Sequence, residues 1–496
     1  MFDIVIKGGR VIDGTGSPSF FADVAIKDGK IARVGKKLEG KDVIDATGLV
    51  VTPGFIDSHS HADAAVFSYP EQIEKVEQGI TTSIAGQCGS AIAPTKDMSM
   101  GEFFDKVKEV PQGANIVTLI GHSNLRRVVM GIEDRDPTAE EMKQMEDILR
   151  DGMEKGALGM SLGLIYTPSC SAKPEELISL AKIVGEYGGI IAAHIRNESE
   201  FVMSAVEEFI NIAKGGNVRA VVSHHKSTKK ENWGKVNATL RVIDEANEEG
   251  YDVYCDVYPY IASHTDLTTT FIPQALRGEG RDAIVAKLKD KVERQKLIDY
   301  NVNLRKSDCL DWVLIANCPE FPEYRGKRVT EIAKMRGVSD YNAMFDILEA
   351  CGGSACYFTM CEEDVEMVMA HPRAMICTDS GVAGKQQYHH PRVRGSFPRV
   401  LGRYVRERGV TTLHEMIRKM TSMPAAVYGL SGKGLIREGM DADICIFDPE
   451  KIIDRADYVD CFKRAEGLNY VLVGGEVVAE NAVHNGKKCG KVILRK

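Results

Sequence analysis

The sequence predicts an α/β protein, a (β/α)8 TIM barrel with an inserted lid segment, plus a small β-sandwich domain formed by both chain ends. Three observations support this. The two ends of the chain are β-rich, the middle alternates short apolar runs with helix-like stretches, and 496 residues exceed one ordinary core. The predicted bounds are 1–52 and 431–496 for the small domain, 53–430 for the barrel, and about 264–370 for the lid.

The chain ends share one pattern, in which short apolar runs are separated by Gly and Asp turns. In the first fifty residues the runs are Asp3–Ile6, Val11–Ile12, Asp23–Ile26, Lys30–Val34 and Val43–Ile44. In the last sixty they are Gly434–Ile436, Ala442–Phe447, Tyr470–Val473 and Glu476–Val478. This spacing predicts a small antiparallel β unit to which both termini contribute.

The middle of the chain contains eight candidate strands separated by helix-like stretches. The strands are Val50–Ile56, Thr81–Ala85, Asn115–Gly121, Ala157–Leu162, Gly189–His194, Arg219–His224, Asp252–Tyr258 and Ala374–Thr378. Predicted helices include Thr138–Lys155, Pro174–Tyr187 and Glu200–Lys214, the first opened by a capping box. Eight such units predict the barrel. The long gap before the eighth strand is expected to hold the seventh helix and the lid.

Composition excludes several classes of function. The net charge is −8 with both signs well mixed, which is unlike a nucleic-acid-binding surface. No apolar run approaches the ~18 residues that a membrane span requires. The first residues of the chain predict a β-strand rather than a signal peptide. The twelve cysteines form no CxxC pair, so we expect a reduced, cytoplasmic protein. Cys351, Cys356 and Cys361 are expected to be buried thiols rather than a second metal centre.

Potential metal ligands follow several of the predicted strands. His59 and His61 are one residue apart, so in a strand both would face the same way. A barrel gathers the carboxyl ends of its strands into one site, and imidazole and thiolate are ligands of zinc. The sequence therefore predicts a metal site. The six candidate ligands, from five strand ends, are His59, His61, Cys88, His194, His224 and Asp379. His225 has the opposite parity and is expected to support its neighbour or to pack.

Here the chain resembles a known family. Its motifs, between two β-rich ends, are HxH, GxCG, AHxRxE, SHHK and a strand-eight Asp. This pattern of motifs is similar to that of the amidohydrolase superfamily. Within it the chain resembles the N-acyl-D-amino-acid deacylases (D-aminoacylases). The more specific motifs are Cys88 with Ile92-Ala93-Pro94 behind it, and His390-Pro391-Arg392 followed by Gly395–Gly402. Thr52–Asp57 and Gly439–Asp443 match the wider superfamily.

The resemblance implies a zinc-dependent hydrolase that cleaves N-acyl-D-amino acids to a carboxylate and a free D-amino acid. Cys88 would replace the carboxylated lysine that other members carry on strand four. Cys88, His194 and His224 would hold one tight zinc, and His59 and His61 would face a weaker second position. Asp379 would be the general base for a metal-activated water. The resemblance also implies that the substrate carboxylate is held by Tyr166, Lys226 and Arg392.

Two departures from the family pattern concern the site. Gln87 stands where the family usually has Asn. The stretch Val382–His389 is altered, and the family places it beside the substrate, so the preferred side chain stays open. Arg196 is two residues beyond His194 and is expected to share its face and to orient the groups behind the ligands.

Other interpretations remain open at this point. Asp379 could be a helix N-cap, and Lys226 and Arg392 could be solvated charges. The substrate could be a dipeptide ending in a D-residue, an N-acyl-D-glutamate or -aspartate, or a cyclic amide as in hydantoinases and dihydroorotases. The chain could also be a non-catalytic scaffold that kept the fold. The oligomeric state is not predicted.

Overall fold

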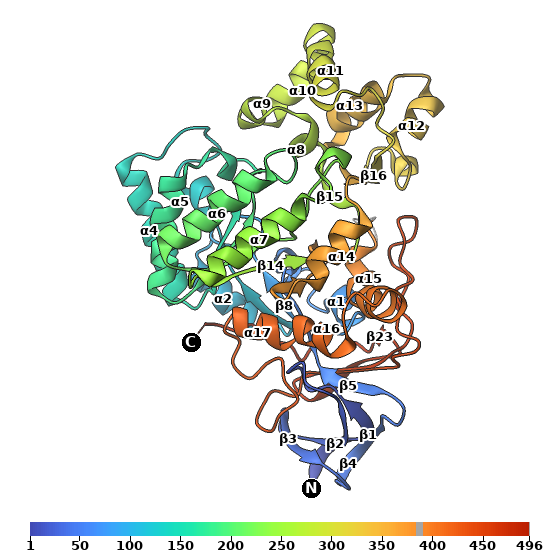
Figure 1. The fold of residues 1–496 in the computed structure, drawn as a ribbon. Coiled ribbons are helices and arrows are strands. Elements are labelled where there is room, and N and C mark those ends of the chain that lie inside the picture. Colours follow the sequence, from blue (N-terminus) through green and yellow to red (C-terminus); the bar gives the residue numbers. More distant parts are fainter. Residues whose placement is uncertain (383–389, 496) are drawn as a thin grey trace.

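The computed structural model describes residues 1–382 and 390–495, and the fold is mixed α/β (Figure 1). Strands from both chain ends join in one nine-stranded sheet, which lies at the N-terminal end of the molecule in Figure 1. Its strands are β1 (Phe2–Val11), β2 (Phe20–Lys27), β3 (Lys30–Gly35), β4 (Gly40–Asp45), β5 (Val50–Pro53), β20 (Ile444–Phe447), β21 (Leu468–Val473), β22 (Glu476–Glu480) and β23 (Val483–His484).

This sheet differs in two ways from the small antiparallel sandwich that the sequence predicts. Hydrogen bonding makes it one continuous sheet, in the order β23-β22-β21-β20-β5-β1-β2-β3 with β4 on β1. It is also mixed, because β1 pairs in parallel with both β4 and β5. The physical reason is the length of β1. Its ten residues pair with β2 along one edge and leave room on the other for two successive strands.

The first predicted barrel strand, Val50–Ile56, is divided between two sheets. β5 belongs to the terminal sheet, and β6 (Phe55–Asp57) pairs in parallel with β8 (Ile80–Ala85). Gly54 lies between them, where a Cβ atom would be 2.3 Å from the side chain of Thr81. The absence of a side chain at Gly54 therefore lets the chain pass tightly from one sheet to the other.

The other predicted strands of the middle region are confirmed, with shifts of one or two residues at their ends. They are β8, β9 (Asn115–Thr118) with β10 (Ile120–Gly121), β11 (Gly159–Gly163), β12 (Ile190–His194), β13 (Arg219–Val222), β14 (Val253–Val257) and β18 (Ala374–Ile376). Parallel pairing runs β6-β8-β9 and β10-β11-β12-β13-β14-β18. The short strands β7 (Ser60–His61) and β19 (Ser380–Gly381) also pair in parallel, so the last strand region lies beside the first.

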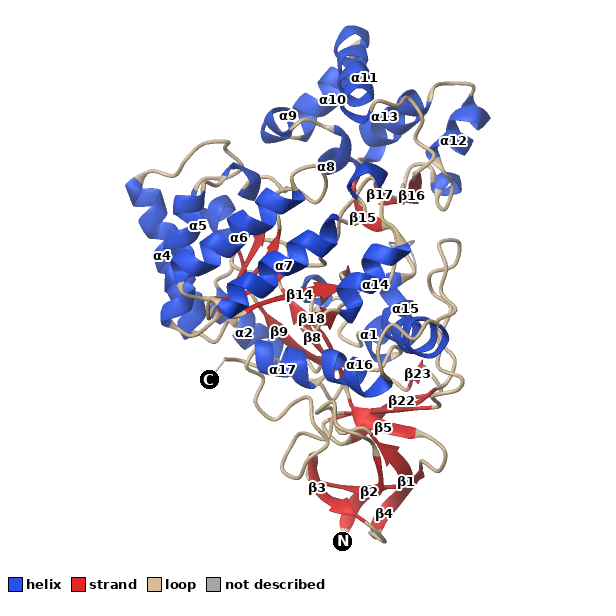
Figure 2. Cartoon of the chain, viewed as in Figure 1, coloured by secondary structure: helices blue, strands red, loops and turns tan. Residues whose placement is uncertain are grey.

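Helices cover the outside of these strands (Figure 2). The predicted helices are confirmed as α4 (Ala139–Glu154), α5 (Pro174–Glu186) and α6 (Val202–Gly216). Thr138 and Glu141 form the predicted capping box. The remaining helices of this layer are α1 (Ile73–Val76), α2 (Met100–Lys108), α3 (His122–Val129), α7 (Lys235–Glu248), α14 (Glu362–Ala370), α15 (Arg392–Arg399), the π-helix η5 (Val400–Glu407), α16 (Leu413–Met420) and α17 (Ser422–Val427).

The long segment between β14 and β18 builds a separate lobe at the end of the molecule away from the N-terminus (Figure 1). It contains β15 (Ser263–Asp266), α8 (Leu267–Phe271), α9 (Gln274–Gly278), α10 (Arg281–Lys289), α11 (Lys291–Arg305), β16 (Val313–Asn317), α12 (Val329–Arg336), α13 (Asp340–Cys351) and β17 (Ser354–Tyr357). Its buried apolar residues form a cluster of their own. The next helix, α14, packs instead on α7, β14 and β18, which is the position expected of the seventh helix.

Two further sequence predictions concern the clustered cysteines and the absence of a membrane span. Cys356 and Cys361 are buried, as expected. Cys351 is partly exposed, and its sulfur lies 3.5 Å from that of Cys318. Among residues 1–382 and 390–495, no helix has both the length and the apolar character to cross a membrane.

Candidate metal centre

The predicted ligands lie at the carboxyl ends of the parallel strands. His61 is on β7 with His59 just before it, and His194 ends β12. Cys88 follows β8, His224 follows β13 and Asp379 follows β18. The last three have left-handed backbones, with φ of 53°, 36° and 49°. Non-glycine residues adopt this conformation at a cost, and such strain is concentrated at functional sites.

The donor atoms of these residues converge around the sulfur of Cys88. Cys88 Sγ lies 3.3 Å from His59 Nε2, 3.4 Å from His224 Nε2 and 3.9 Å from His194 Nδ1. Asp379 Oδ1 lies 3.6 Å from His59 Nε2 and 3.4 Å from His61 Nε2. One atom each of His59, Cys88, His224 and Asp379 lies within 4.8 Å of the others, close enough to share a metal ion.

The charge states of the cluster suit a cation. Burial, with the neighbouring imidazoles, lowers the pKa of His59 well below its usual value, and burial lowers the pKa of His194 to about 3. Both rings are therefore neutral, as metal ligands must be. Burial raises the pKa of Asp379, but Arg392, His224 and His61 outweigh it and hold that pKa well below its usual value. Burial raises the pKa of the Cys88 thiol, whereas a bound cation would deprotonate it.

The far sides of the histidine rings also fit a metal site. His59 Nδ1 and His194 Nε2 are buried without a hydrogen-bond partner. A carboxylate lies behind each, with Asp256 Oδ1 at 4.0 Å from His59 Nδ1 and Glu198 Oε2 at 3.6 Å from His194 Nε2. Metal-bound histidines usually offer their second nitrogen to a carboxylate. A set of sulfur, imidazole and carboxylate donors is typical of zinc.

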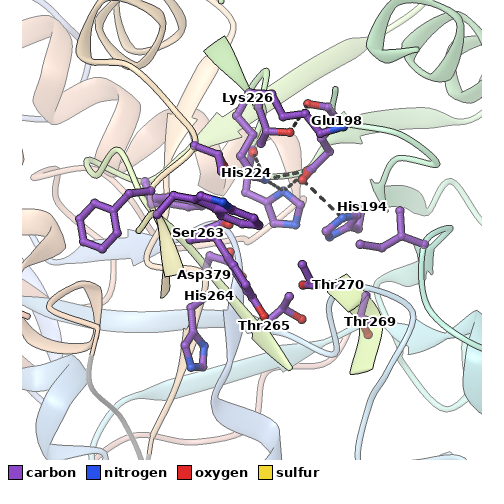
Figure 3. Close-up of a pocket in the computed structure, with 18 of the residues that line it drawn as sticks. His194, Glu198, His224, Lys226, Ser263, His264, Thr265, Thr269, Thr270 and Asp379 are labelled. Carbon is purple, nitrogen blue, oxygen red and sulfur yellow. Dashed lines mark hydrogen bonds and ion pairs between the residues drawn. The ribbon is translucent and has the colours of Figure 1, made fainter. Parts of the chain in front are cut away.

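Sequence reasoning missed Glu198 and Asp256 as supports of these ligands. Glu198 is the last residue of the AHxRxE motif, and Asp256 lies in the seventh strand, so both had a sequence signal. Glu198 Oε1 lies 3.2 Å from His224 Nδ1 and accepts a 2.6 Å hydrogen bond from Lys226 (Figure 3). Asp256 accepts the backbone N–H of His224, and its burial raises its pKa to about 7.

His194, Glu198 and His224 form a second group that could hold a metal. The Lys226 ammonium already lies there, 2.8 Å from His224 Nδ1 and 2.6 Å from Glu198. A second cation in this place would be repelled, so we infer that the metal centre is the group around Cys88.

A cavity of about 800 Å³ opens onto the cluster. Tyr166, Lys226 and Arg392, the predicted substrate-binding residues, all line it. The Tyr166 ring lies 5.0 Å from that of His194, and Arg392 donates a 2.7 Å hydrogen bond to Asp379 Oδ2. His61, Cys88, His194, His224 and Asp379 line the same cavity, whereas His59 is fully buried behind them. The structure thus brings all nine predicted site residues to one place.

Three other residues near the ligands have different surroundings. Arg196 does not support the cluster as predicted, because it bonds Glu208 and the carbonyls of Cys170 and Ala172. His225 packs and lies 2.7 Å from the Thr239 hydroxyl. Gln87 donates to the Ser58 carbonyl. Of the altered stretch Val382–His389, residues 383–389 lie outside the described part of the chain.

The backbone around Asp379 is fixed by a buried ammonium that the sequence did not reveal. Lys75 Nζ is fully buried and donates to Asp57 Oδ2 at 2.9 Å, to Thr378 Oγ1 at 2.8 Å and to the Ser380 carbonyl at 2.7 Å. Thr378 and Ser380 flank Asp379, whose own N–H donates to the His59 carbonyl. Lys75 thereby ties the end of the eighth strand to the first.

Comparisons with known proteins agree with this fold and site. A model of the amidohydrolase family matches residues 42–479. The chain is 32% identical to a D-aminoacylase of Alcaligenes xylosoxydans xylosoxydans, covering 100% of this chain and 98% of that protein. It is 34% identical to an N-acyl-D-glutamate deacylase of the same organism, covering 99% and 96%.

One solved structure extends the comparison to three dimensions. It is the N-acyl-D-glutamate deacylase of Bordetella bronchiseptica, complexed with zinc and a phosphonate inhibitor, with a TM-score of 0.86, 33% identity and full coverage of both chains. The chain therefore belongs to the amidohydrolase family. Within that family it is a member of the D-aminoacylase group, as its motifs predicted.

Proposed function

We propose that this protein is a zinc-dependent hydrolase that cleaves the amide bond of N-acyl-D-amino acids. The observation that carries the proposal is the cluster itself. Five of the six potential ligands line one cavity and His59 lies buried behind them, and one of the five, Asp379, is a buried carboxylate beside Arg392. The relatives named above, which act on N-acyl-D-amino acids by their names, support the same choice of reaction.

We also propose that the parallel strands close into a (β/α)8 barrel. The supporting contacts are the pairing of β7 with β19 and the hydrogen bond from Asp379 N to His59 O, which join the eighth strand to the first. The barrel domain would span 53–430, and 1–52 with 431–496 would form the small β domain. The lobe within 264–370 would act as the lid, since several of its residues line the cavity.

We propose the following metal ligands, because their donor atoms are of the types that zinc prefers and lie close together. Cys88, His194 and His224 would hold one zinc tightly, and His59 and His61 would face a second, weaker position. When bound, zinc would polarise the amide carbonyl and lower the pKa of water. Glu198 and Asp256 would orient the histidine rings from behind.

Asp379 is the proposed general base. Its low pKa keeps it ionised at neutral pH, so it can accept a proton from the attacking water. It would then deliver that proton to the leaving amine nitrogen. Arg392 holds the carboxylate in place through Oδ2 and leaves Oδ1 directed at the histidines.

Recognition of the substrate carboxylate is assigned to Tyr166, Lys226 and Arg392. Arg392 can bind a carboxylate through two parallel hydrogen bonds. Lys226 is nearly fully buried and is held at the cavity by Glu198. Tyr258, which the sequence did not single out, lies beneath both cations, with its ring 5.6 Å from Lys226 Nζ and 5.1 Å from the Arg392 guanidinium.

The rival reactions have less support. A cyclic amidohydrolase usually carries a lysine on strand four, and β11 contains none. A scaffold without catalysis would lack candidate ligands, and the convergence of six of them here supports a catalytic protein instead. A dipeptide with a C-terminal D-residue remains a variant of the same amide chemistry.

The experiment that tests the proposal is hydrolysis of a panel of N-acetyl-D- and N-acetyl-L-amino acids, with the metal content measured on the same preparation. We expect cleavage of D-substrates and one or two zinc ions per chain. A zinc-loaded protein that cleaves only dipeptides or cyclic amides would replace the proposed substrate. A metal-free, inactive protein would favour the scaffold.

A further inference from the structure

One wall of the cavity is made of hydroxyl side chains from a single stretch of the inserted lobe. These are Ser263 and Thr265 on β15, and Thr269 and Thr270 on α8. In Figure 3 the three threonines lie on the His194 side of the cavity. Thr265 and Tyr166 line the same cavity, and the Tyr166 ring lies 5.0 Å from that of His194, so this wall adjoins the candidate metal centre.

Aliphatic side chains are scarce around the cavity. Among the described residues that line it, Ile165 is the one aliphatic residue. Helix α8 does contain apolar residues, but Leu267 and Phe271 are buried in the lobe's own core. The helix thus directs its apolar residues into the lobe, and two of its three threonines, Thr269 and Thr270, line the cavity.

A wall of this kind selects against an aliphatic group. The Thr269 hydroxyl donates to Asp266 Oδ2 and the Thr270 hydroxyl donates to the Asp266 carbonyl, so both offer acceptor lone pairs to the cavity. In solution water donates to such lone pairs, and an aliphatic side chain would displace that water without replacing the bonds. A substrate group that can hydrogen bond replaces them. Sites built in this way discriminate strongly against the analogue that lacks the polar group.

Three of the cationic side chains that line the cavity, Lys226, Arg392 and Arg305, are buried or partly buried and already have oxygen partners. Lys226 and Arg392 are assigned above to the substrate carboxylate and bond Glu198 and Asp379. Arg305 donates to the carbonyl of Thr270 and to Asn301 Oδ1, and it packs over the Phe271 ring. The wall therefore suits a neutral polar group better than a second carboxylate.

We propose that the side chain of the D-amino acid is polar and uncharged, ending in a carboxamide or a hydroxyl, and that Ser263, Thr265, Thr269 and Thr270 receive it. This inference rests on the proposed deacylase activity and narrows its substrate class.

The test compares isosteric pairs of substrates on the zinc-loaded protein. The pairs are N-acetyl-D-asparagine with N-acetyl-D-leucine, D-glutamine with D-methionine, and D-threonine with D-valine. We expect the polar member of each pair to have at least about a tenfold higher kcat/KM. N-acetyl-D-aspartate and N-acetyl-D-phenylalanine complete the panel.

A substitution tests whether the hydroxyl residues of this wall cause the preference for polar substrates. Thr270→Val keeps the shape and removes the hydroxyl, so the asparagine-to-leucine ratio should fall about fivefold. Thr268→Val, on the same helix at a residue that does not line the cavity, is the matched control and should leave the ratio unchanged.

Three results would overturn the inference. Equal or better cleavage of the aliphatic substrates would do so while leaving the deacylase activity standing, and so would a preference for aspartate or phenylalanine over asparagine. Failure to cleave any acyl-D-amino acid, with zinc bound, would remove both this inference and the proposed function.

Discussion

Substitution of Lys75 by methionine should destabilise the whole protein. The Lys75 ammonium and the Asp57 carboxylate are both fully buried, 2.9 Å apart. The ammonium also donates to Thr378 and Ser380, and Asp57 accepts the backbone N–H of Thr378. Lys75→Met removes these bonds and leaves Asp57 as an uncompensated buried charge.

The expected loss of stability can be worked out from the burial of the Lys75–Asp57 ion pair. Breaking a buried ion pair by removing one partner costs about 3–5 kcal/mol. In a domain of about 200 residues ~1 kcal/mol moves Tm by about 2–4 °C, and by less in a longer chain. We therefore expect a fall in Tm of roughly 5–10 °C. Turnover should fall as well, because Thr378 and Ser380 hold Asp379 between them.

The assay is thermal unfolding followed by circular dichroism, with Lys143→Met as the control. Lys143 pairs with Asp147 on the exposed face of α4, and such surface pairs contribute little. The double variant Lys75→Met/Asp57→Asn removes the unpaired charge and should recover much of the Tm. A loss for Lys75→Met no greater than that of the control would refute the reasoning.

Four further outcomes follow from the geometry. Asp379→Ala should retain zinc by mass spectrometry yet lose nearly all turnover, and substantial activity would remove Asp379 from the reaction. Cys88→Ala should lower the zinc content, which full retention would contradict. Glu198→Gln should weaken zinc affinity by about 10–100-fold in a chelator competition, and an unchanged affinity would exclude its supporting role. Burial would raise the pKa of Glu176, but His122 and Arg126 outweigh it and hold that pKa at about 2, below the ordinary 4.5. This stabilisation is therefore present above pH 4.5 and is lost as the pH falls toward 2. Glu176→Gln should reduce the acid dependence of the urea midpoint in that range, whereas an unchanged profile would show that Glu176 contributes nothing to it.

The strand positions could be predicted because they depend on local pattern. A parallel strand that is buried on both faces is a short apolar run, and turns mark its ends, so β8 to β14 were found within one or two residues. The candidate ligands could be selected from the sequence for a related reason. Their residue types are uncommon, and each follows such a run, where a parallel sheet gathers its strand ends.

The division of the predicted strand at Gly54 could not be predicted in this way. Val50–Ile56 is one continuous apolar run, and it enters two sheets because strands from distant parts of the chain, β20 and β8, pair with its two halves. The parallel pairing of β1 with β4 and β5 likewise depends on which edges were free once β2 had paired.

The sequence by itself determined the order of strands and helices, the candidate ligands and the family. Tertiary structure alone decided the roles of the ordinary charged residues. Lys75 and Lys143 are the same residue type in helices, yet one is buried under Asp379 and the other is in solvent. The reason is that the energy of a charge depends on its burial and its partners, and the partners of Lys75 near Ser380 are about three hundred positions away in the chain.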